Sequence, residues 1–158
     1  MPDSTTPIWK RPDIISHTQN LLDSYRHWVG RELIERSGSP EDQSRAAYEA
    51  PIAILSDGLE ASPIFNYGNA TVQRLFETDW DHFTKIVSRN SAEVVHQAER
   101  ERLRDQVTQK GFIDNYRGIR ISSTGRRFWI ENAVVWVVRD NTGKILGKAA
   151  TFAGWTYL

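Results

Sequence analysis

The sequence contains no cysteine, no excess of charge of either sign and no long hydrophobic run. Without cysteine there is no disulfide, thiolate metal site, cysteine nucleophile or thiol-linked chromophore. Twenty basic residues balance twenty acidic ones, so no net field draws the chain to nucleic acid or an anionic membrane. No run approaches the roughly 18–20 apolar residues of a membrane span, and no signal region precedes the first helix. We therefore expect a cytoplasmic protein without nucleic-acid or membrane partners.

The first part of the chain has the pattern of an irregular arm followed by a long amphipathic helix. Residues 1–11 contain two prolines and no periodicity, whereas apolar residues recur at helical spacing over 13–36. Pro12 suits the first helical position, and Ser37-Gly38 is expected to end the helix. The apolar stripe of this leader helix has to be buried either on a sheet or against a second copy of the chain. We expect a symmetric homodimer that uses it.

The middle of the chain is predicted to contain two short strands among helices. The strands are expected at 51–56 and 64–67, and Asn-Gly-Asn after the second strand turns the chain into a helix. The predicted helices span 40–49, 70–76, a short segment that begins at a Thr78–Asp81 capping pair, and 92–110.

The helix predicted at 92–110 has only a narrow apolar stripe. Its members recur at helical spacing and are Val94, Val95, Ala98, Leu103 and Val107. The run Glu99 to Asp105 alternates in sign, and we interpret it as a solvated face of the helix.

After Gly111 the apolar period changes to that of strands. Over 126–139 one face is expected to carry Phe128, Ile130, Asn132, Val134, Trp136 and Val138. Two early and three late strands, separated by helices, predict an α+β fold with a five-stranded antiparallel sheet and helices on one face. In this division residues 1–38 are the arm and leader helix, and residues 39–158 are the domain.

Several segments resemble the PAS sensor fold and, more closely, the PAS-like MEKHLA domain. They are SPIFNYGNAT (62–71), FETDWDHF (76–83), SRNSAE (88–93), GFIDNYRGIRISSTGRRFWIENAVVW (111–136) and GKAATFAGW (147–155). The leader helix is similar to that of small bacterial members. The resemblance implies a sensor that binds a small molecule in the hollow of the sheet, or dimerises, and signals through a separate partner. It carries over no catalytic residue, and Glu77 stands where PAS domains usually have glycine.

The hollow of the sheet is the expected ligand pocket, and it should be mostly apolar with a few polar groups. The candidate lining residues are Tyr67, Asn69, Phe83, Ile119, Phe128, Ile130, Asn132, Val134 and Trp136. Asn69, like Asn66, has two interpretations, which are a cap of the strand-to-helix corner and a ligand donor. A buried Asn132 needs a partner, and a ligand, a side chain, the backbone or a water can each supply one.

The other polar candidates have simpler explanations beside their functional ones. Arg126 and Arg127 are candidates for contact with an anion or a partner, or they belong to a solvated hairpin. His96 lies on the predicted helix 92–110, and a helical histidine binds haem iron in some PAS domains. We do not expect haem here, because a single histidine on a polar helix is more often a surface residue. His17 and His27 on the leader helix show no metal-ligand spacing with a carboxylate or another histidine, and no metal site is predicted.

Three functions remain open from the sequence. The first is a non-catalytic sensor or interaction module that holds a small apolar molecule or a protein partner. The second is a small enzyme that acts in the same cavity with His82 or Asn132 as its polar group. The third is a dimerisation scaffold with a filled core.

Overall fold

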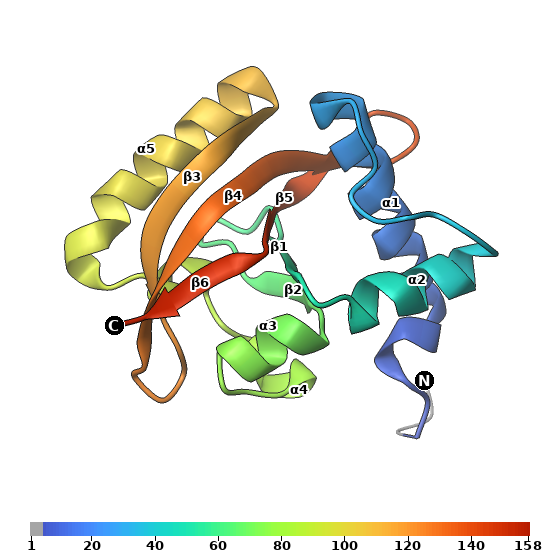
Figure 1. The fold of residues 1–158 in the computed structure, drawn as a ribbon. Coiled ribbons are helices and arrows are strands. Elements are labelled where there is room, and N and C mark those ends of the chain that lie inside the picture. The colour runs from blue at the N-terminus through green and yellow to red at the C-terminus, as the bar shows by residue number, and fades with distance from the viewer. Residues whose placement is uncertain (1–4) are drawn as a thin grey trace.

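One antiparallel sheet forms the centre of the computed structural model, which describes residues 5–158 (Figure 1). The strands are β1 (Ala53–Asp57), β2 (Phe65–Gly68), β3 (Phe112–Ile121), β4 (Arg127–Arg139), β5 (Ile145–Phe152) and β6 (Gly154–Tyr157). Their order is β2-β1-β5-β4-β3, with β6 paired to the first half of β4 and β5 to its second half. The predicted antiparallel sheet is confirmed, and it has a sixth strand beyond the five predicted, because β6 pairs with the part of β4 that β5 does not reach.

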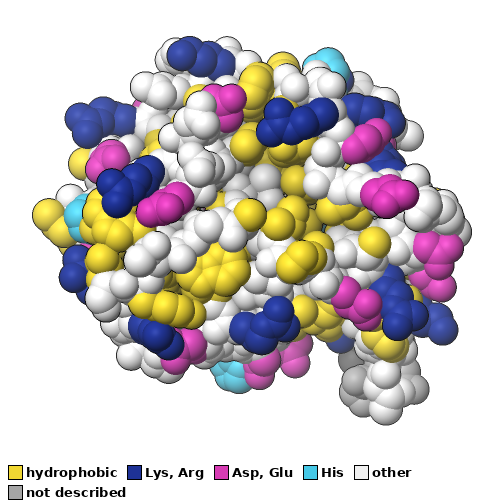
Figure 2. Space-filling model, in the orientation of Figure 1, with side chains coloured by type: hydrophobic (Ala, Val, Ile, Leu, Met, Phe, Trp, Pro, Cys, Tyr) yellow, Lys and Arg dark blue, Asp and Glu magenta, His cyan; other side chains and the backbone are white. Residues whose placement is uncertain are grey.

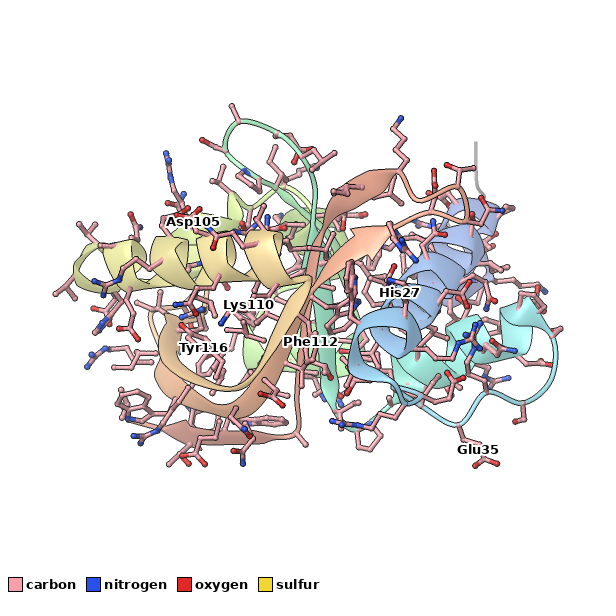
Figure 3. The ribbon with its side chains drawn as sticks, turned by 90° about the horizontal axis from the view of Figure 1, so that it is seen from above. His27, Glu35, Asp105, Lys110, Phe112 and Tyr116 are labelled. Carbon is pink, nitrogen blue, oxygen red and sulfur yellow. The ribbon has the colours of Figure 1, made fainter. Side chains whose placement is uncertain are left out.

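Helices cover both faces of this sheet (Figures 1 and 3). The helices are α1 (Pro12–Val29), α2 (Pro40–Glu49), α3 (Ala70–Leu75), α4 (Trp80–Phe83) and α5 (Val94–Lys110), with 3-10 turns η1 (Ile8–Lys10) and η2 (Ser88–Ser91). One face packs against α3, α4 and α5, and the other packs against α1 and α2. Of the arm predicted at 1–11, residues 1–4 lie outside the described residues, and η1 occupies part of the rest.

The leader helix α1 is shorter than its apolar pattern predicts. It ends at Val29 because Gly30 has a φ of 82°, a left-handed conformation that glycine adopts without strain. Its buried side chains pack with Tyr67, Val134 and Trp136 on the back of the sheet. Of the two burial partners left open by the sequence, the structure therefore uses the sheet, and homodimerisation through α1 stays a prediction.

Polar contacts fix both ends of the connection between α1 and α2. The guanidinium of Arg36 donates to Asp23 Oδ1 at 2.7 Å and to Gln19 Oε1 at 2.8 Å on α1. Its Nε donates to Gln43 Oε1 of α2 at 2.9 Å. The helix predicted at 40–49 is confirmed, and Ser39 caps it in a reciprocal pair with Asp42.

Two asparagines in the left-handed backbone region bend the β3–β4 hairpin. Asn115 has a φ of 56° and Asn132 a φ of 52°, and asparagine tolerates this region better than most residues. The pairing shifts on both sides of Tyr116, so each strand carries one extra residue. Such bulges increase the local twist, which wraps the hairpin around the core.

The bulge at Asn132 overturns the expected arrangement of β4. An inserted residue moves the following side chains to the opposite face. Phe128 and Ile130 accordingly pack in the cluster with α3 and α4, whereas Val134 and Trp136 pack against α1. Asn132 itself is exposed. The prediction that these residues share one face is therefore wrong, and so is the prediction of a buried Asn132 amide.

The left-handed geometry of Asn132 predicts an unusual order among substitutions. Asn132→Gly should leave the free energy of unfolding unchanged or raise it slightly, because glycine adopts this backbone freely. Asn132→Val should lower it by about 1–2 kcal/mol, because a β-branched residue is strained there. Urea denaturation measures both, with Glu131→Val on the adjacent residue as the control. A harmless Asn132→Val would contradict the bulge geometry.

A chain of hydrogen bonds joins α1 to β1 and β2. His17 Nε2 lies 2.8 Å from Ser56 Oγ, and that hydroxyl donates to Asn66 Oδ1. The imidazole therefore donates from Nε2, which requires no charge. Burial lowers the pKa of His17 from 6.5 to about 4, against the opposite effect of nearby Asp13. The folded protein thus holds this ring neutral.

Acid should weaken the docking of α1 through His17. Between pH 6.5 and about 4 the unfolded chain binds a proton at His17 that the folded chain does not. The free energy of unfolding therefore decreases as the pH is lowered through this window. From pH 7 to 4.5 the wild type should lose about 2 kcal/mol more than His17→Gln. Chemical denaturation at each pH measures this, and His96→Gln is the control. Parallel pH profiles for wild type and His17→Gln would refute the assignment.

Candidate functional site

A cavity of about 60 Å³ lies between the sheet and α5, partly open to solvent. Its apolar wall comes mainly from the sheet, with Phe76 from just after α3 and Leu103 from α5, and consists of Leu55, Phe65, Phe76, Leu103, Ile130, Val135, Ala149, Ala150 and Phe152. Its polar lining is Ser56, Asp57, Ser91, Arg100, Arg104, Arg120 and Lys148. An apolar hollow with a few convergent polar groups is the usual form of a small-molecule site.

Asp57 is the buried acid of this cavity. It ends β1, and its side chain is 3% exposed. Arg104 binds both carboxylate oxygens, with Nη2 3.0 Å from Oδ1 and Nη1 2.8 Å from Oδ2. Ser88 of η2 donates to Oδ2 at 2.7 Å. A two-point arginine–carboxylate contact is among the strongest polar contacts in proteins, so it holds α5 against the C-terminal end of β1.

Arg100 lies one turn before Arg104 on α5 and is also buried. Its Nη2 donates to Ser88 Oγ at 3.0 Å, and its Nη1 donates to Glu101 Oε1 at 3.2 Å. Burial, followed by the positive charges of Arg104 and Arg120, lowers the pKa of Arg100 to about 10. The guanidinium therefore remains charged at neutral pH.

The inward face of α5 differs from the one predicted. Arg100, Leu103, Arg104 and Val107 are spaced as one helical stripe, and Leu103 and Val107 pack on Val135 and Val137 of β4. Val94 and Val95, placed in the stripe by the sequence, are 84% and 79% exposed. The interpretation of the run Glu99 to Asp105 as solvated is therefore wrong for Arg100 and Arg104.

The residues predicted to line a pocket are distributed over both faces of the sheet. Ile130 is the one of them that lines the cavity. Phe83 and Phe128 pack behind the cavity wall with Phe65 and Phe76, and Ile119 lies in β3 opposite Trp129. Tyr67, Val134 and Trp136 lie on the α1 side, where Val134 and Trp136 follow the Asn132 bulge. Whether Ile130 contacts a ligand stays a prediction.

Asn69 is a structural residue of the strand-to-helix corner. Its Oδ1 accepts from the backbone N–H groups of Val72 and Ile54, at 3.1 and 3.2 Å. Its Nδ2 donates to the carbonyls of Ala47 and Ile52, at 3.1 and 2.8 Å. These four bonds use the full capacity of the amide, so the cap interpretation holds and no group is left for a ligand.

The structure around α4 differs from the sequence prediction in the residue that caps the helix. Asp79, not Thr78, caps α4 by accepting from the backbone N–H of His82, so the predicted Thr78–Asp81 pair is wrong. His82 is exposed, and its Nδ1 lies 2.6 Å from Asp79 Oδ1. Glu77 takes a left-handed conformation with a φ of 56°, and its carboxylate accepts from Ser122 Oγ. The fold thus accommodates a side chain where PAS domains usually have glycine.

The basic hairpin residues have partners within the chain. The Arg126 guanidinium lies 3.4 Å from the centre of the Tyr157 ring, and Arg127 pairs with Glu93. Beside them Arg117 lies 4.0 Å from the centre of the Trp129 ring. On the face shown in Figure 2, hydrophobic side chains gather near the centre, and basic and acidic side chains lie around them. A contact of Arg126 or Arg127 with an anion or a partner stays a prediction.

Neither a membrane span nor a metal-binding cluster occurs among the described residues. No described helix is long and apolar enough to cross a membrane. Residues 5–158 also contain no group of three or more His, Asp or Glu side chains placed to hold a metal ion. His96 does not line the cavity between the sheet and α5.

The twisted sheet, the helix α5 across its hollow and the cavity between them define a PAS-fold domain. Similar solved structures include an RNA-binding light-oxygen-voltage receptor, with a TM-score of 0.61, 20% identity, and coverage of 76% of this chain and 34% of that one. The PAS domain of a Colwellia psychrerythraea protein gives 0.60, 13%, 75% and 95% for the same quantities. A Burkholderia thailandensis PAS domain described as a complex with ethanol gives 0.53, 15%, 72% and 95%.

Within this class the chain belongs to the MEKHLA domain family, whose family model matches residues 15–157. The homeobox-leucine zipper protein HOX29 of Oryza sativa subsp. indica is 28% identical over 157 residues. REVOLUTA, a homeobox-leucine zipper protein of Arabidopsis thaliana, is 25% identical over 156 residues. Both alignments cover 93% of this chain, which spans 18% of the length of each of these curated relatives. The bacterial origin and the division at residue 38 stay predictions.

The Asp57 contacts predict a large difference between two charge-equivalent substitutions. Asp57→Asn leaves Arg104 buried without its counterion and should lower the free energy of unfolding by about 3 kcal/mol. Asp105→Asn removes the same charge from an exposed position on α5 and should change it by less than about 0.5 kcal/mol (Figure 3). Urea denaturation at neutral pH compares them. Equal losses would show that the Asp57 pair does not hold α5.

Proposed function

We propose that this chain is a non-catalytic sensor module that binds a small molecule in the cavity between the sheet and α5. The observation that carries the proposal is the position of the cavity. It adjoins the contacts of Asp57 with Arg104, which join α5 to β1. A molecule bound there touches both elements, so binding alters how firmly α5 is held, and α5 reports occupancy to a separate partner protein.

Similar folds support a ligand in this position. One PAS domain of similar fold is described as a complex with ethanol, a molecule of few atoms. A small ligand suits a cavity of about 60 Å³. The absence of cysteine is compatible with a non-covalently held ligand and excludes a cysteinyl adduct.

An enzyme that acts in the same cavity is the less favoured alternative. Its two proposed polar groups were His82 and Asn132, and neither lines the cavity. His82 is exposed on α4 and paired with Asp79, and Asn132 is exposed in the β4 bulge. Without either group at the cavity, the enzyme hypothesis has no acid or base assigned by the sequence.

Native mass spectrometry of freshly purified protein tests the sensor proposal against a filled scaffold. The wild type should carry a reproducible extra mass of a small molecule. Ala150→Leu, which fills the cavity from β5, should abolish this mass while the protein stays folded. Ala98→Leu on the exposed side of α5 is the matched control and should retain it.

Thermal denaturation with a panel of short acids, alcohols and amides provides the second measurement. At least one compound should raise the melting temperature of the wild type and of Ala98→Leu but not of Ala150→Leu. A clean ligand-free mass together with no shift from any compound would favour the dimerisation scaffold.

A further inference from the structure

Positive charge exceeds negative charge around the cavity. Four basic side chains line it, from α5 (Arg100 and Arg104), β3 (Arg120) and β5 (Lys148), against the single acid Asp57. The two carboxylate oxygens of Asp57 are already bound by Arg104 and Ser88. Asp57 Oδ2 also lies 3.8 Å from Arg100 Nη2, so this one acid is shared by the two arginines of α5 and positive charge remains in excess around the cavity.

Two of these cations have no carboxylate partner among the described residues. Arg120 donates to the Ile119 carbonyl and to the Tyr116 hydroxyl, which are both uncharged. Lys148 lies opposite Asp57 in the pairing of β1 with β5, but its ammonium makes no ion pair within 4.0 Å in the described part of the chain. Arg100 has two carboxylate neighbours, which are Glu101 at 3.2 Å, with a side chain that is 59% exposed, and Asp57 at 3.8 Å.

The cations also act on one another. Burial, then the charge of Arg104, lowers the pKa of Lys148, and the charges of Arg104 and Arg120 act in the same direction on Arg100. Positive groups that are partly withdrawn from water and unpaired create a positive potential, which favours an anion in the cavity that they line.

The rest of the cavity wall is apolar. Phe65, Phe76, Ile130 and Phe152 contribute aromatic and aliphatic surface and no charged group. An inorganic anion such as phosphate is polar on every side and would leave this surface without a matching partner. The ligand therefore needs a negative group at one end and an apolar body at the other.

We infer that the cavity binds a short-chain carboxylic acid, with its carboxylate held by Lys148 and Arg120 and its hydrocarbon part against the aromatic wall. This inference rests on the proposed function and names the ligand class of the same site. The carboxylate also comes within reach of Arg100 on α5. Binding thus adds an ionic link between α5 and the sheet, beside those of Asp57 with Arg104 and Arg100.

Calorimetric titration of the full chain with butyrate, butan-1-ol and inorganic phosphate tests the ligand class. Butyrate should bind at least about 10-fold more tightly than butan-1-ol, which has a similar body without the charge. It should also bind at least about 10-fold more tightly than phosphate, which has charge without an apolar body. Equal binding of either competitor would overturn the inference.

Two variants identify the side chains that hold the carboxylate. Lys148→Met and Arg120→Met should each weaken butyrate about 10-fold and change butan-1-ol by less than about 2-fold. Lys144→Met, an exposed lysine in the turn before β5, is the matched control and should bind butyrate as the wild type does. Unchanged butyrate affinity in Lys148→Met and Arg120→Met would overturn the assignment. If one variant fails to fold, the titration of the wild type with butyrate, butan-1-ol and phosphate still tests the ligand class.

Failure of the inference is distinguishable from failure of the proposed function. If butan-1-ol binds at least as well as butyrate and Ala150→Leu blocks both, the cavity is a small-molecule site without anion preference. If neither compound binds the wild type and no small molecule copurifies, both the inference and the sensor proposal are refuted.

Discussion

The strand β4 contributes side chains to two separate cores, one on each face of the sheet. It does so because the extra residue at Asn132 reverses the direction of the side chains that follow it. Before the bulge, Phe128 and Ile130 pack under α3 and α4. After it, Val134 and Trp136 pack under α1. A regular strand would place all four on one face and leave either the α1 side or the cavity side without its large side chains. The bulge also lies where β5 gives way to β6, so the curvature of the whole hairpin depends on it.

Sequence reasoning succeeded where a local pattern determines structure. The strand-to-helix corner at Asn69, the cap of α2 by Ser39 and the order of strands and helices all follow from residues close together in the chain. It failed where one residue changes the phase of a longer pattern. Asn132 alternates in sequence with apolar residues, and nothing in that alternation indicates a left-handed backbone, although asparagine is among the residues that tolerate it.

The polar lining of the cavity was missed for a related reason. A run of alternating charges is normally solvated, and by composition Glu99 to Asp105 is such a run. The spacing of Arg100 and Arg104 with Leu103 and Val107 contains the missing signal, since the four fall on one helical stripe. The local sequence does not show that Asp57 lies beside Arg104, because the two residues are 47 positions apart. The Asp57 carboxylate pairs with the Arg104 guanidinium and thereby allows it to be buried. Tertiary pairing of this kind determines the site and has no local signature.

The contacts of Arg36 have a structural consequence. By binding Asp23 and Gln19 on one helix and Gln43 on the other, this residue joins α1 to α2. The far end of α2 is hydrogen-bonded through the Ala47 carbonyl to Asn69, at the corner where β2 turns into α3. These contacts connect α1 and α2 to that corner on the face of the sheet opposite the cavity. The two faces of the sheet therefore carry separate sets of contacts, with α1 and α2 on one face and α5 with the cavity on the other.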